Sequence, residues 1–423
     1  MAAVKTKLKA NANCKLCEFK IPDPNYIYCP QCGNKLSSDG IYPPIKLNYL
    51  WEKEHGGKII YENFKAVRDF GLPANEEIHI RRTLGNTAHP YLMEIRRFST
   101  LFICPHMTTE LYKIGKLMGY FSSEIAFKTT NLEPAIQSLR NSGIFWTVFE
   151  NKRIQDTYCG IWRSQGYGDI HLTKVDRKNR TVQYSVKYIT PIVHSNRPLC
   201  DVELGTLCGS AEVMFSGFWC GNETECQHSG NKTCKFNLHL SEKNVDSELP
   251  TMESDEYSPI LDNVLERIIT NEENRLNHKE YFHISADQCL NYMLSSPSPG
   301  HYVLSKHAGV ITGKRIAKEA DLIELSIKER LDYLRNLFTY LKAGIISKVE
   351  ERSPERILIH MDESVYASGV NNIDLKLCVF LAGIIEGVIN EGSKTRWEVT
   401  EKDCLASGND DCVFLAKQRT LGY

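Results

Sequence analysis

Hydrophobic residues in the C-terminal third of the chain follow two different periods. Over much of this region apolar positions recur every three or four residues, which is the spacing of amphipathic helices. Shorter apolar segments between and after these stretches are typical of strands. The predicted elements are helices at residues 301–320, 326–346 and 375–390, and strands at residues 356–361, 397–404 and 412–417.

The first half of the chain predicts a similar order of elements. Helices come first, residues 145–149 take the place of the first strand, and a hairpin is inserted before a second Cys-bearing helix. Mixed helices and an antiparallel sheet in each half predict an α+β fold. The expected elements are helices at residues 108–129 and 132–143, the segment 145–149, and the inserted hairpin at residues 169–188.

The segments outside these two halves differ from them in composition. Residues 45–100 mix short aromatic-rich strands with a helix near residues 61–70, and we assign them to an N-terminal extension of the first unit. Residues 242–258 are rich in Ser, Asp and Glu, which is typical of a linker. A helix with one charged face at residues 260–277 is expected to join the two units.

A repeat underlies the similarity of the two halves. Residues 199–236 match residues 377–414 without a gap when the chain is shifted by 178 positions. A match at a fixed period indicates one structural unit that is used twice. The matched positions include three cysteines, one glutamate, three glycines and a tryptophan, and the tryptophans are Trp219 and Trp397.

The repeated cysteines and glutamate have the composition of a metal site. Three thiolates and one carboxylate make four ligands, which is the number that zinc takes in a closed structural site. A Cys226–Cys234 disulfide, or thiols buried as small hydrophobic groups, are the alternatives. We favour the metal because the glutamate repeats together with the thiols. The two candidate sets are Cys200, Glu223, Cys226 and Cys234, and Cys378, Glu401, Cys404 and Cys412.

A second type of metal motif lies near the N-terminus. Two CxxC pairs, Cys14–Cys17 and Cys29–Cys32, are separated by 11 residues, and each pair presents two thiolates from a tight turn. The motif predicts a zinc ribbon, for which paired disulfides are the alternative. The predicted organisation is a zinc ribbon at residues 12–36, a first domain at 45–240 that includes its extension, an acidic linker at 241–258, and a second domain at 259–423.

Composition narrows the cellular setting and the partners. The net charge is −1 and the basic residues of the ribbon are scattered, so nucleic acid is not the expected partner. Ten of the 15 cysteines fall in the three proposed metal sites, and the odd remainder fits a reducing compartment. No apolar run is long enough to span a bilayer. We therefore expect a cytoplasmic protein with about three zinc ions per chain, in which iron is the alternative metal.

The repeated pattern resembles a known family. Leu-Cys-x4-Gly-x3-Gly followed by Trp-x3-Glu-x2-Cys-x2-Ser-Gly-x3-Cys-x-Phe is similar to the 4-vinyl-reductase domain, a small hydrocarbon-binding domain. The resemblance implies the fold that trafficking-tether subunits share with nitric-oxide-signalling domains. It also implies a structural zinc, held by the Glu and Cys residues, beside a buried pocket for an aromatic ligand. Two such domains in tandem behind a zinc ribbon are therefore expected.

The sequence favours a binding protein over an enzyme, because it contains neither a dinucleotide fingerprint nor a defensible catalytic triad. Our main hypothesis is a non-catalytic sensor that binds a small apolar or aromatic molecule and signals to a protein partner. Alternatives are a structural scaffold for complex assembly, with a homodimer among the possible assemblies, and a reductase or accessory factor acting on a tetrapyrrole-like substrate. No catalytic residue is assigned.

Two further expectations concern the helices. Gly115, Gly309 and Gly313 lie near lysines, as in phosphate-binding loops, but we interpret them as glycines that allow helices to pack closely. The ligand pocket is expected in the second unit, between the Cys-bearing helix 375–390 and the preceding helix 326–346, because these helices are the more continuously apolar pair.

Overall fold

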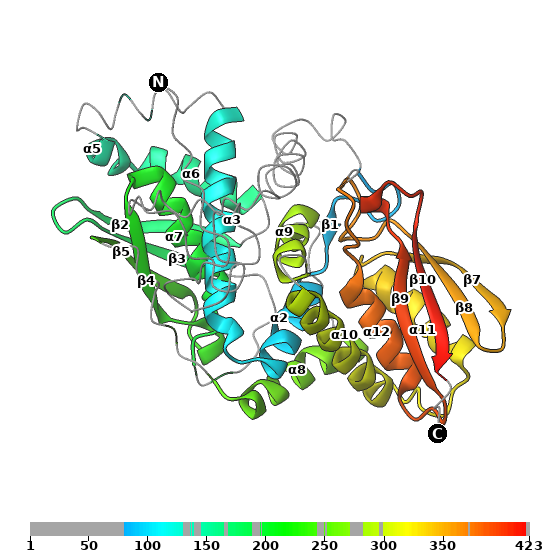
Figure 1. Ribbon diagram of the computed structural model, residues 1–423. Helices are drawn as coiled ribbons and strands as arrows, with labels where there is room; N and C mark the ends of the chain where they lie inside the picture. Colours follow the sequence, from blue (N-terminus) through cyan, green and yellow to red (C-terminus); the bar gives the residue numbers. More distant parts are fainter. Residues whose placement is uncertain are drawn as a thin grey trace, which may run out of the picture.

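The computed structural model describes residues 80–129, 136, 138, 145–164, 168–187, 195, 197–242, 249, 252–270, 282–295, 299–370 and 373–419. The predicted zinc ribbon, the helix near residues 61–70 and most of residues 132–143 lie outside the described residues. The described part combines helices with two four-stranded antiparallel sheets, which confirms the prediction of an α+β fold. In Figure 1 the two sheets lie at opposite ends of the molecule, with most of the helices between them.

The first unit contains a sheet with strand order β2-β3-β5-β4. Its helices and strands enclose one hydrophobic core, in which Tyr184, Trp219 and Phe236 are completely buried. Its elements are α3 (Met107–Thr129), α5 (Phe145–Phe149), α6 (Lys152–Ser164), β2 (Asp169–Asp176), β3 (Thr181–Lys187), α7 (Asp201–Phe215), β4 (Phe218–Glu225) and β5 (Cys234–Ser241).

Two predictions for the first unit were wrong. Residues 145–149 form the helix α5 rather than a strand, because Phe145 and Phe149 lie on one helical face and both rings contact Phe215. The hairpin β2–β3 is no insertion. Strand β3 pairs with β5 as β8 (Arg356–Asp362) pairs with β10 (Cys412–Arg419), so the hairpin belongs to the repeated sheet.

The second unit contains a sheet with the corresponding strand order β7-β8-β10-β9. Ser326 caps α11 (Ile327–Tyr340) in a reciprocal capping box with Glu329, which explains why the predicted helix begins here. The other elements are α10 (Pro299–Glu319), β7 (Ile345–Ser353), α12 (Val379–Asn390) and β9 (Arg396–Asp403). The predicted helices and strands of this unit are confirmed, with shifts at their ends: Ile345 and Ile346 belong to β7, and α12 begins at Val379.

The helices between the two sheets come from both sides of the first unit in the sequence. Helix α2 (Pro90–Ile103) packs against α8 (Ser254–Ile269) and α10, in the same core as the second unit. Helix α9 (Ile284–Ser295) follows, and β1 (Thr87–Ala88) pairs with β6 (Phe282–His283). The described residues before the first unit therefore pack mainly against α8 and α10, and Arg97 of α2 also contacts α7 of the first unit. Helix α8 also shows that the last residues of the predicted acidic linker are helical.

Arg81 fixes the segment before α2 to the second unit. Its buried guanidinium donates hydrogen bonds to the carbonyl oxygens of Lys342 (2.6 Å) and Glu363 (3.3 Å). The carboxylate of Glu363 in turn accepts the backbone N–H groups of Thr83 (2.8 Å) and Leu84 (2.8 Å). We call residues 80–88 the N-terminal strap. Because buried polar groups require partners, these contacts hold the strap in one position.

Each unit has a central pair of helices in backbone contact at glycines. A Cβ atom added at Gly209 of α7 would lie 1.7 Å from the carbonyl oxygen of Lys116 on α3. One added at Gly383 of α12 would lie 2.3 Å from that of Lys306 on α10. The interpretation of Gly115, Gly309 and Gly313 as packing glycines is confirmed, because an added Cβ atom would meet the partner helix at each of them. Gly119, Gly205 and Gly387 make the same kind of contact.

Candidate metal centres

Each unit brings its three cysteines and its glutamate together at one end of the sheet. The first cysteine is the N-cap residue of α7 or α12, and the glutamate lies near the end of β4 or β9. The second cysteine precedes a single 3₁₀ turn and the third begins the returning strand. The 3₁₀ turns are η3 (Gln227–Ser229) and η5 (Leu405–Ser407). The hairpin and helix origins predicted for the ligands are thus observed, although the first cysteine caps its helix from outside.

The local sequence explains why both turns have the same shape. Gly230 and Gly408 end the 3₁₀ turns with φ of 87°, in the left-handed region that glycine adopts without strain. The side-chain amides of Asn231 and Asn409 then donate to the carbonyl oxygens of the second cysteines, each at 3.1 Å. The Ser-Gly-Asn triplet of the repeat therefore shapes the turn and is not a ligand set.

The sulfur atoms are spaced as tetrahedral metal coordination requires. In the first centre the Sγ of Cys200 lies 3.8 Å from that of Cys226 and 3.6 Å from that of Cys234. In the second centre the Sγ of Cys412 lies 3.6 Å from that of Cys378 and 4.0 Å from that of Cys404. A zinc–sulfur bond of about 2.3 Å gives a tetrahedral edge of about 3.8 Å.

The two glutamates complete the sets of four. In each centre all four ligand atoms lie within 4.8 Å of one another. The Oε2 atoms of Glu223 and Glu401 accept the backbone N–H of the first cysteine, at 3.3 Å and 2.8 Å. Both Oε1 atoms are buried without a hydrogen-bond partner. A buried carboxylate oxygen without a partner costs free energy, and a cation at the centre of the set would remove that cost.

Burial shapes the ionisation of the metal-free centres. Burial, together with the neighbouring thiol of Cys226, raises the pKa of Glu223 to about 9. The same causes raise the pKa of Glu401 well above its usual value. Burial also raises the pKa of Cys378, whereas hydrogen bonds from the other two thiols lower that of Cys412 to about 5. Four acidic ligands in one buried place therefore need a cation before all of them can ionise.

These observations favour a metal site over the two alternatives for the cysteines. Ten of the described cysteines are free, and none of those in the two centres forms a disulfide. Packing as small hydrophobic groups does not explain the two unpartnered glutamate oxygens. Both centres can therefore hold a metal ion. The predicted ribbon ligands, Cys14, Cys17, Cys29 and Cys32, lie outside the described residues.

The first centre has a charged neighbourhood that the sequence did not lead us to expect. Arg97 of α2 is buried against Asp201, lies 3.4 Å from Glu203 and 3.9 Å from Glu94. The positions that match Asp201 and Glu203 in the second repeat are the apolar Val379 and Leu381. The difference between the repeats at these two positions is the sequence signal for this charged neighbourhood.

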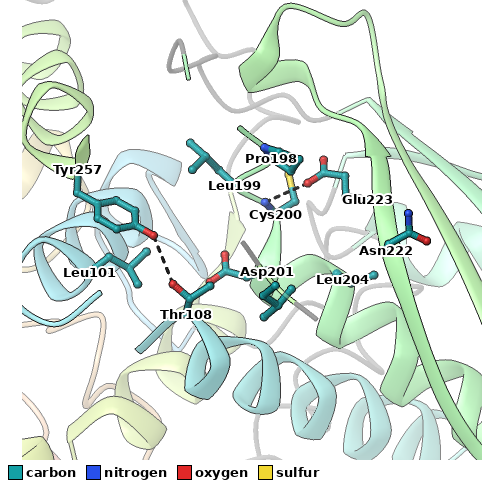
Figure 2. A pocket seen from close by; sticks show the side chains of 11 residues that line it. Leu101, Thr108, Pro198, Leu199, Cys200, Asp201, Leu204, Asn222, Glu223 and Tyr257 are labelled. Carbon is teal, nitrogen blue, oxygen red and sulfur yellow. Dashed lines mark hydrogen bonds between the residues drawn. The ribbon is translucent and has the colours of Figure 1, made fainter. Parts of the chain in front are cut away.

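A cavity of about 220 Å³ adjoins the first centre. Leu199, Cys200 and Glu223 form its wall on the side of the centre, and Thr108 and Tyr257 face them from α3 and α8 (Figure 2). The hydroxyl oxygens of Thr108 and Tyr257 lie 3.3 Å apart. The remaining lining residues are Leu101, Pro198, Asp201, Leu204, Asn222 and Leu249.

The structure does not support the pocket predicted in the second unit. Leu334 and Phe338 of α11 and Ile385 of α12 are all buried in the continuous core of this unit. Arg330 of α11 also donates to the carbonyl oxygens of Val388 (2.9 Å) and Ile389 (3.1 Å), at the end of α12. Among the described residues, the cavity that adjoins a metal centre lies in the first unit, and the pocket between α11 and α12 stays a prediction.

Part of the chain is similar in sequence to known proteins. Residues 357–418, which include the second centre, match the model of the V4R domain. An uncharacterized protein of Methanocaldococcus jannaschii is 30% identical over 107 residues, which make up 25% of this chain. The chain spans 60% of the length of that relative.

A solved structure of a vinyl-4-reductase family protein from the same organism is 20% identical, with a TM-score of 0.21. It covers 31% of this chain and 68% of its own. In the part of the chain that the structure describes, no helix is both long and apolar enough to cross a membrane.

Proposed function

We propose that the protein is a non-catalytic, zinc-containing binding protein that takes up a small apolar or aromatic molecule and signals its presence to a protein partner. The duplicated Cys3Glu centre, with a cavity against its first copy, is the observation that supports this most. The metal ligands would be Cys200, Glu223, Cys226 and Cys234 in the first unit. In the second unit they would be Cys378, Glu401, Cys404 and Cys412.

Zinc is the metal that best fits these ligands. Thiolates favour zinc over magnesium or calcium, and four protein ligands leave no open position for a substrate. Each ion would therefore tie the first turn of a helix to a hairpin, as a structural element without a catalytic role. Because ligands must lose protons to bind the metal, binding would also remove the unfavourable burial of four acidic groups.

The cavity supports the binding part of the proposal. Five leucine or proline side chains line it, and its volume exceeds the ~150 Å³ of an apolar cavity that holds benzene in another protein. Since Cys200 and Glu223 line both the cavity and the metal centre, a bound molecule would contact the residues that the metal positions. Occupancy of the cavity and order in the first unit would then be linked.

Two measurements test the proposal together. Elemental analysis of freshly purified, reduced protein should give about three zinc ions per chain, two for the described centres and one for the ribbon. Native mass spectrometry of the same sample should show a retained small apolar molecule. One zinc or none would contradict the assignment of the repeated centres, and iron with visible absorbance would replace zinc by iron.

The structural scaffold remains the second candidate, on the basis of one specific observation. The interior of the second unit is filled with apolar side chains, and its α10–α12 contact leaves no room for even one added Cβ atom. A protein that retains no small molecule but purifies as a stable complex would favour this function for the whole chain.

A further inference from the structure

The cavity beside the first metal centre lies at a junction between two parts of the fold. Pro198, Leu199 and Leu204 reach it from the first unit, whereas Leu101 of α2 and Tyr257 of α8 come from the helices that pack with the second unit. We call it the junction cavity. Figure 2 shows Tyr257 and Leu101 on one side of it and Cys200 with Glu223 on the other.

One carboxylate of the junction cavity has an unused acceptor. Asp201 is 94% buried by relative exposure (6% exposed), and its Oδ1 atom is held by Arg97. Its Oδ2 atom is buried without a hydrogen-bond partner. Figure 2 places this side chain between the Thr108–Tyr257 pair and Cys200. A buried carboxylate oxygen of this kind requires a donor, and a ligand in the cavity can supply one.

The charges around Asp201 favour a cationic donor over a neutral one. Arg97 is the buried cation that contacts this group, and it faces three carboxyl groups, those of Glu94, Asp201 and Glu203. With a divalent ion bound, the adjacent metal centre would add three thiolates and a carboxylate, whose four negative charges the ion only half compensates. Negative potential in a partly apolar cavity attracts a cation and repels an anion.

The rest of the lining limits the body of the ligand. Leu101, Leu199, Leu204, Leu249 and Pro198 present apolar surface. A volume of about 220 Å³ holds a single ring with a short side chain, judged by the ~150 Å³ cavity that holds benzene. Thr108 and Tyr257 offer hydroxyl groups as further hydrogen-bond partners.

We infer that the junction cavity binds a small apolar molecule carrying a protonated amine, with the ammonium group donating to Oδ2 of Asp201. This inference rests on the proposed binding function and specifies its ligand class. The bound molecule would contact both α8 and the Cys200 segment, so that it links the first unit to the helices of the second.

Three probes of equal shape test the inference. 2-Phenylethylamine, 2-phenylethanol and phenylacetate share one ring and a two-carbon arm, and they differ in the group that would face Asp201. Calorimetric titration of the full-length, zinc-loaded protein at pH 7.5 should show saturable binding of the amine, weaker binding of the alcohol and none of the acid. Absent amine binding, or acid binding as tight as amine binding, would overturn the inference.

Substitutions then locate the binding. Asp201→Asn should weaken the amine at least about tenfold and the alcohol much less, because a charge-assisted hydrogen bond is lost only for the amine. Asp255→Asn, on an exposed residue of α8, should leave amine binding unchanged. Equal affinity of the wild type and Asp201→Asn for the amine would contradict the role of Asp201.

A second variant keeps the test independent of the Arg97 contacts. Leu249→Trp fills the junction cavity from a partly buried position that has no role in the metal centre. It should abolish amine binding and retain full zinc content, whereas undiminished binding would place the amine elsewhere and refute the inference. Zinc content and retained molecules in the wild type report separately on the proposed function, so the two can fail independently.

Discussion

The two units share a metal centre and a glycine contact but differ in the interior beside them. In the first unit Lys116 and Glu212 form a buried ion pair of 2.9 Å between α3 and α7. Nearby, the Ser210 hydroxyl contacts those of Tyr158 and Ser123, the latter at 2.8 Å. In the second unit Val388 occupies the position of Ser210, and the surroundings are apolar.

The difference shows which parts of the repeat tolerate change. Glu212 matches Asn390, and each accepts the backbone N–H of the repeated tryptophan, at 3.1 Å in Trp219 and 2.7 Å in Trp397. This hydrogen bond is kept although the charge is not. The repeat therefore preserves the contacts that shape the unit, whereas polar groups collect in the first interior.

Loss of one metal ion should have the largest effect on stability, and the part of the molecule that loses stability should differ between the two centres. Cys404→Ser should remove one zinc and destabilise the C-terminal unit by several kcal/mol, because metal-binding free energy, on the order of 10 kcal/mol, is also folding free energy. The core of this unit includes α2 and α8, so its loss should also disturb the junction. Elemental analysis and hydrogen exchange along the chain would measure both effects.

The matched variant in the first unit is Cys226→Ser. It should also remove one zinc, but the loss of protection should centre on the first unit and on α3, which contributes to both cores. Cys208→Ser, at a buried cysteine outside the centres, should keep the full zinc content. If Cys208→Ser lost as much zinc as Cys226→Ser, the choice of ligands would be wrong.

The buried ion pair of the first unit predicts the next largest effect. Glu212→Gln keeps an acceptor for the Trp219 N–H but leaves the ammonium group of Lys116 buried without its counter-charge. Breaking such a pair typically costs about 3–5 kcal/mol. In the second unit Glu386→Gln, whose pair with Lys306 is partly exposed, should cost clearly less in the same denaturant titration. Equal costs would remove the distinction between the two interiors.

Asp287 gives the second unit a pH dependence. Burial raises its pKa to about 7, against about 3.9 for an exposed Asp, so the folded state binds the proton more tightly than the unfolded state does. Its contribution to the free energy of unfolding therefore falls as the pH rises from about 4 to about 7, by about 2–4 kcal/mol.

The Asp287→Asn variant should flatten this pH profile, measured by denaturant titrations at several pH values. Asp321→Asn, on an exposed residue, serves as the control and should reproduce the profile of the wild type. A profile of Asp287→Asn that still falls in parallel with the wild type would show that other groups are responsible.

Substitutions at the glycine contacts should have the smallest effect on stability, and this effect should be similar in the two units. Gly383→Ala and Gly209→Ala should each destabilise by about 1–3 kcal/mol, because the added methyl groups meet backbone oxygen atoms that cannot move aside independently. Lys314→Ala, on the exposed side of α10, should change stability little. If only one glycine proved sensitive, the helix pairs would not be equivalent despite their repeat.

Much of the second unit could be predicted from the sequence. Helices α10, α11 and α12 carry strong local signals, such as the capping box at Ser326, and the hairpin β9–β10 is marked by its Ser-Gly-Asn turn. The two clusters of three cysteines and one glutamate could be predicted because the repeat fixes these residues at matched positions. These features depend on residues that lie close together in the sequence.

The features that were missed depend on distant contacts. Residues 80–103 carry no sequence signal that they pack mainly against α8 and α10. Residues 145–149 are of types that favour strands, but the contacts of Phe145 and Phe149 with Phe215 select a helix. The ligand pocket was predicted in the second unit because its helices are apolar. Apolar composition, however, indicates a well-packed core as readily as a ligand site.

The N-terminal strap has a consequence for how the chain folds during synthesis. The hydrogen bonds of Arg81 cannot form until Lys342, 261 residues later, and Glu363, 282 residues later, have been synthesised. Domains usually fold as the ribosome releases them, and such long-range contacts slow the process. The first unit can therefore fold before α8 and α10 exist, and the apolar face of α2 that they cover stays exposed until both have been translated. Fragments that begin after residue 103 would lack this helix altogether and would expose the core that it covers.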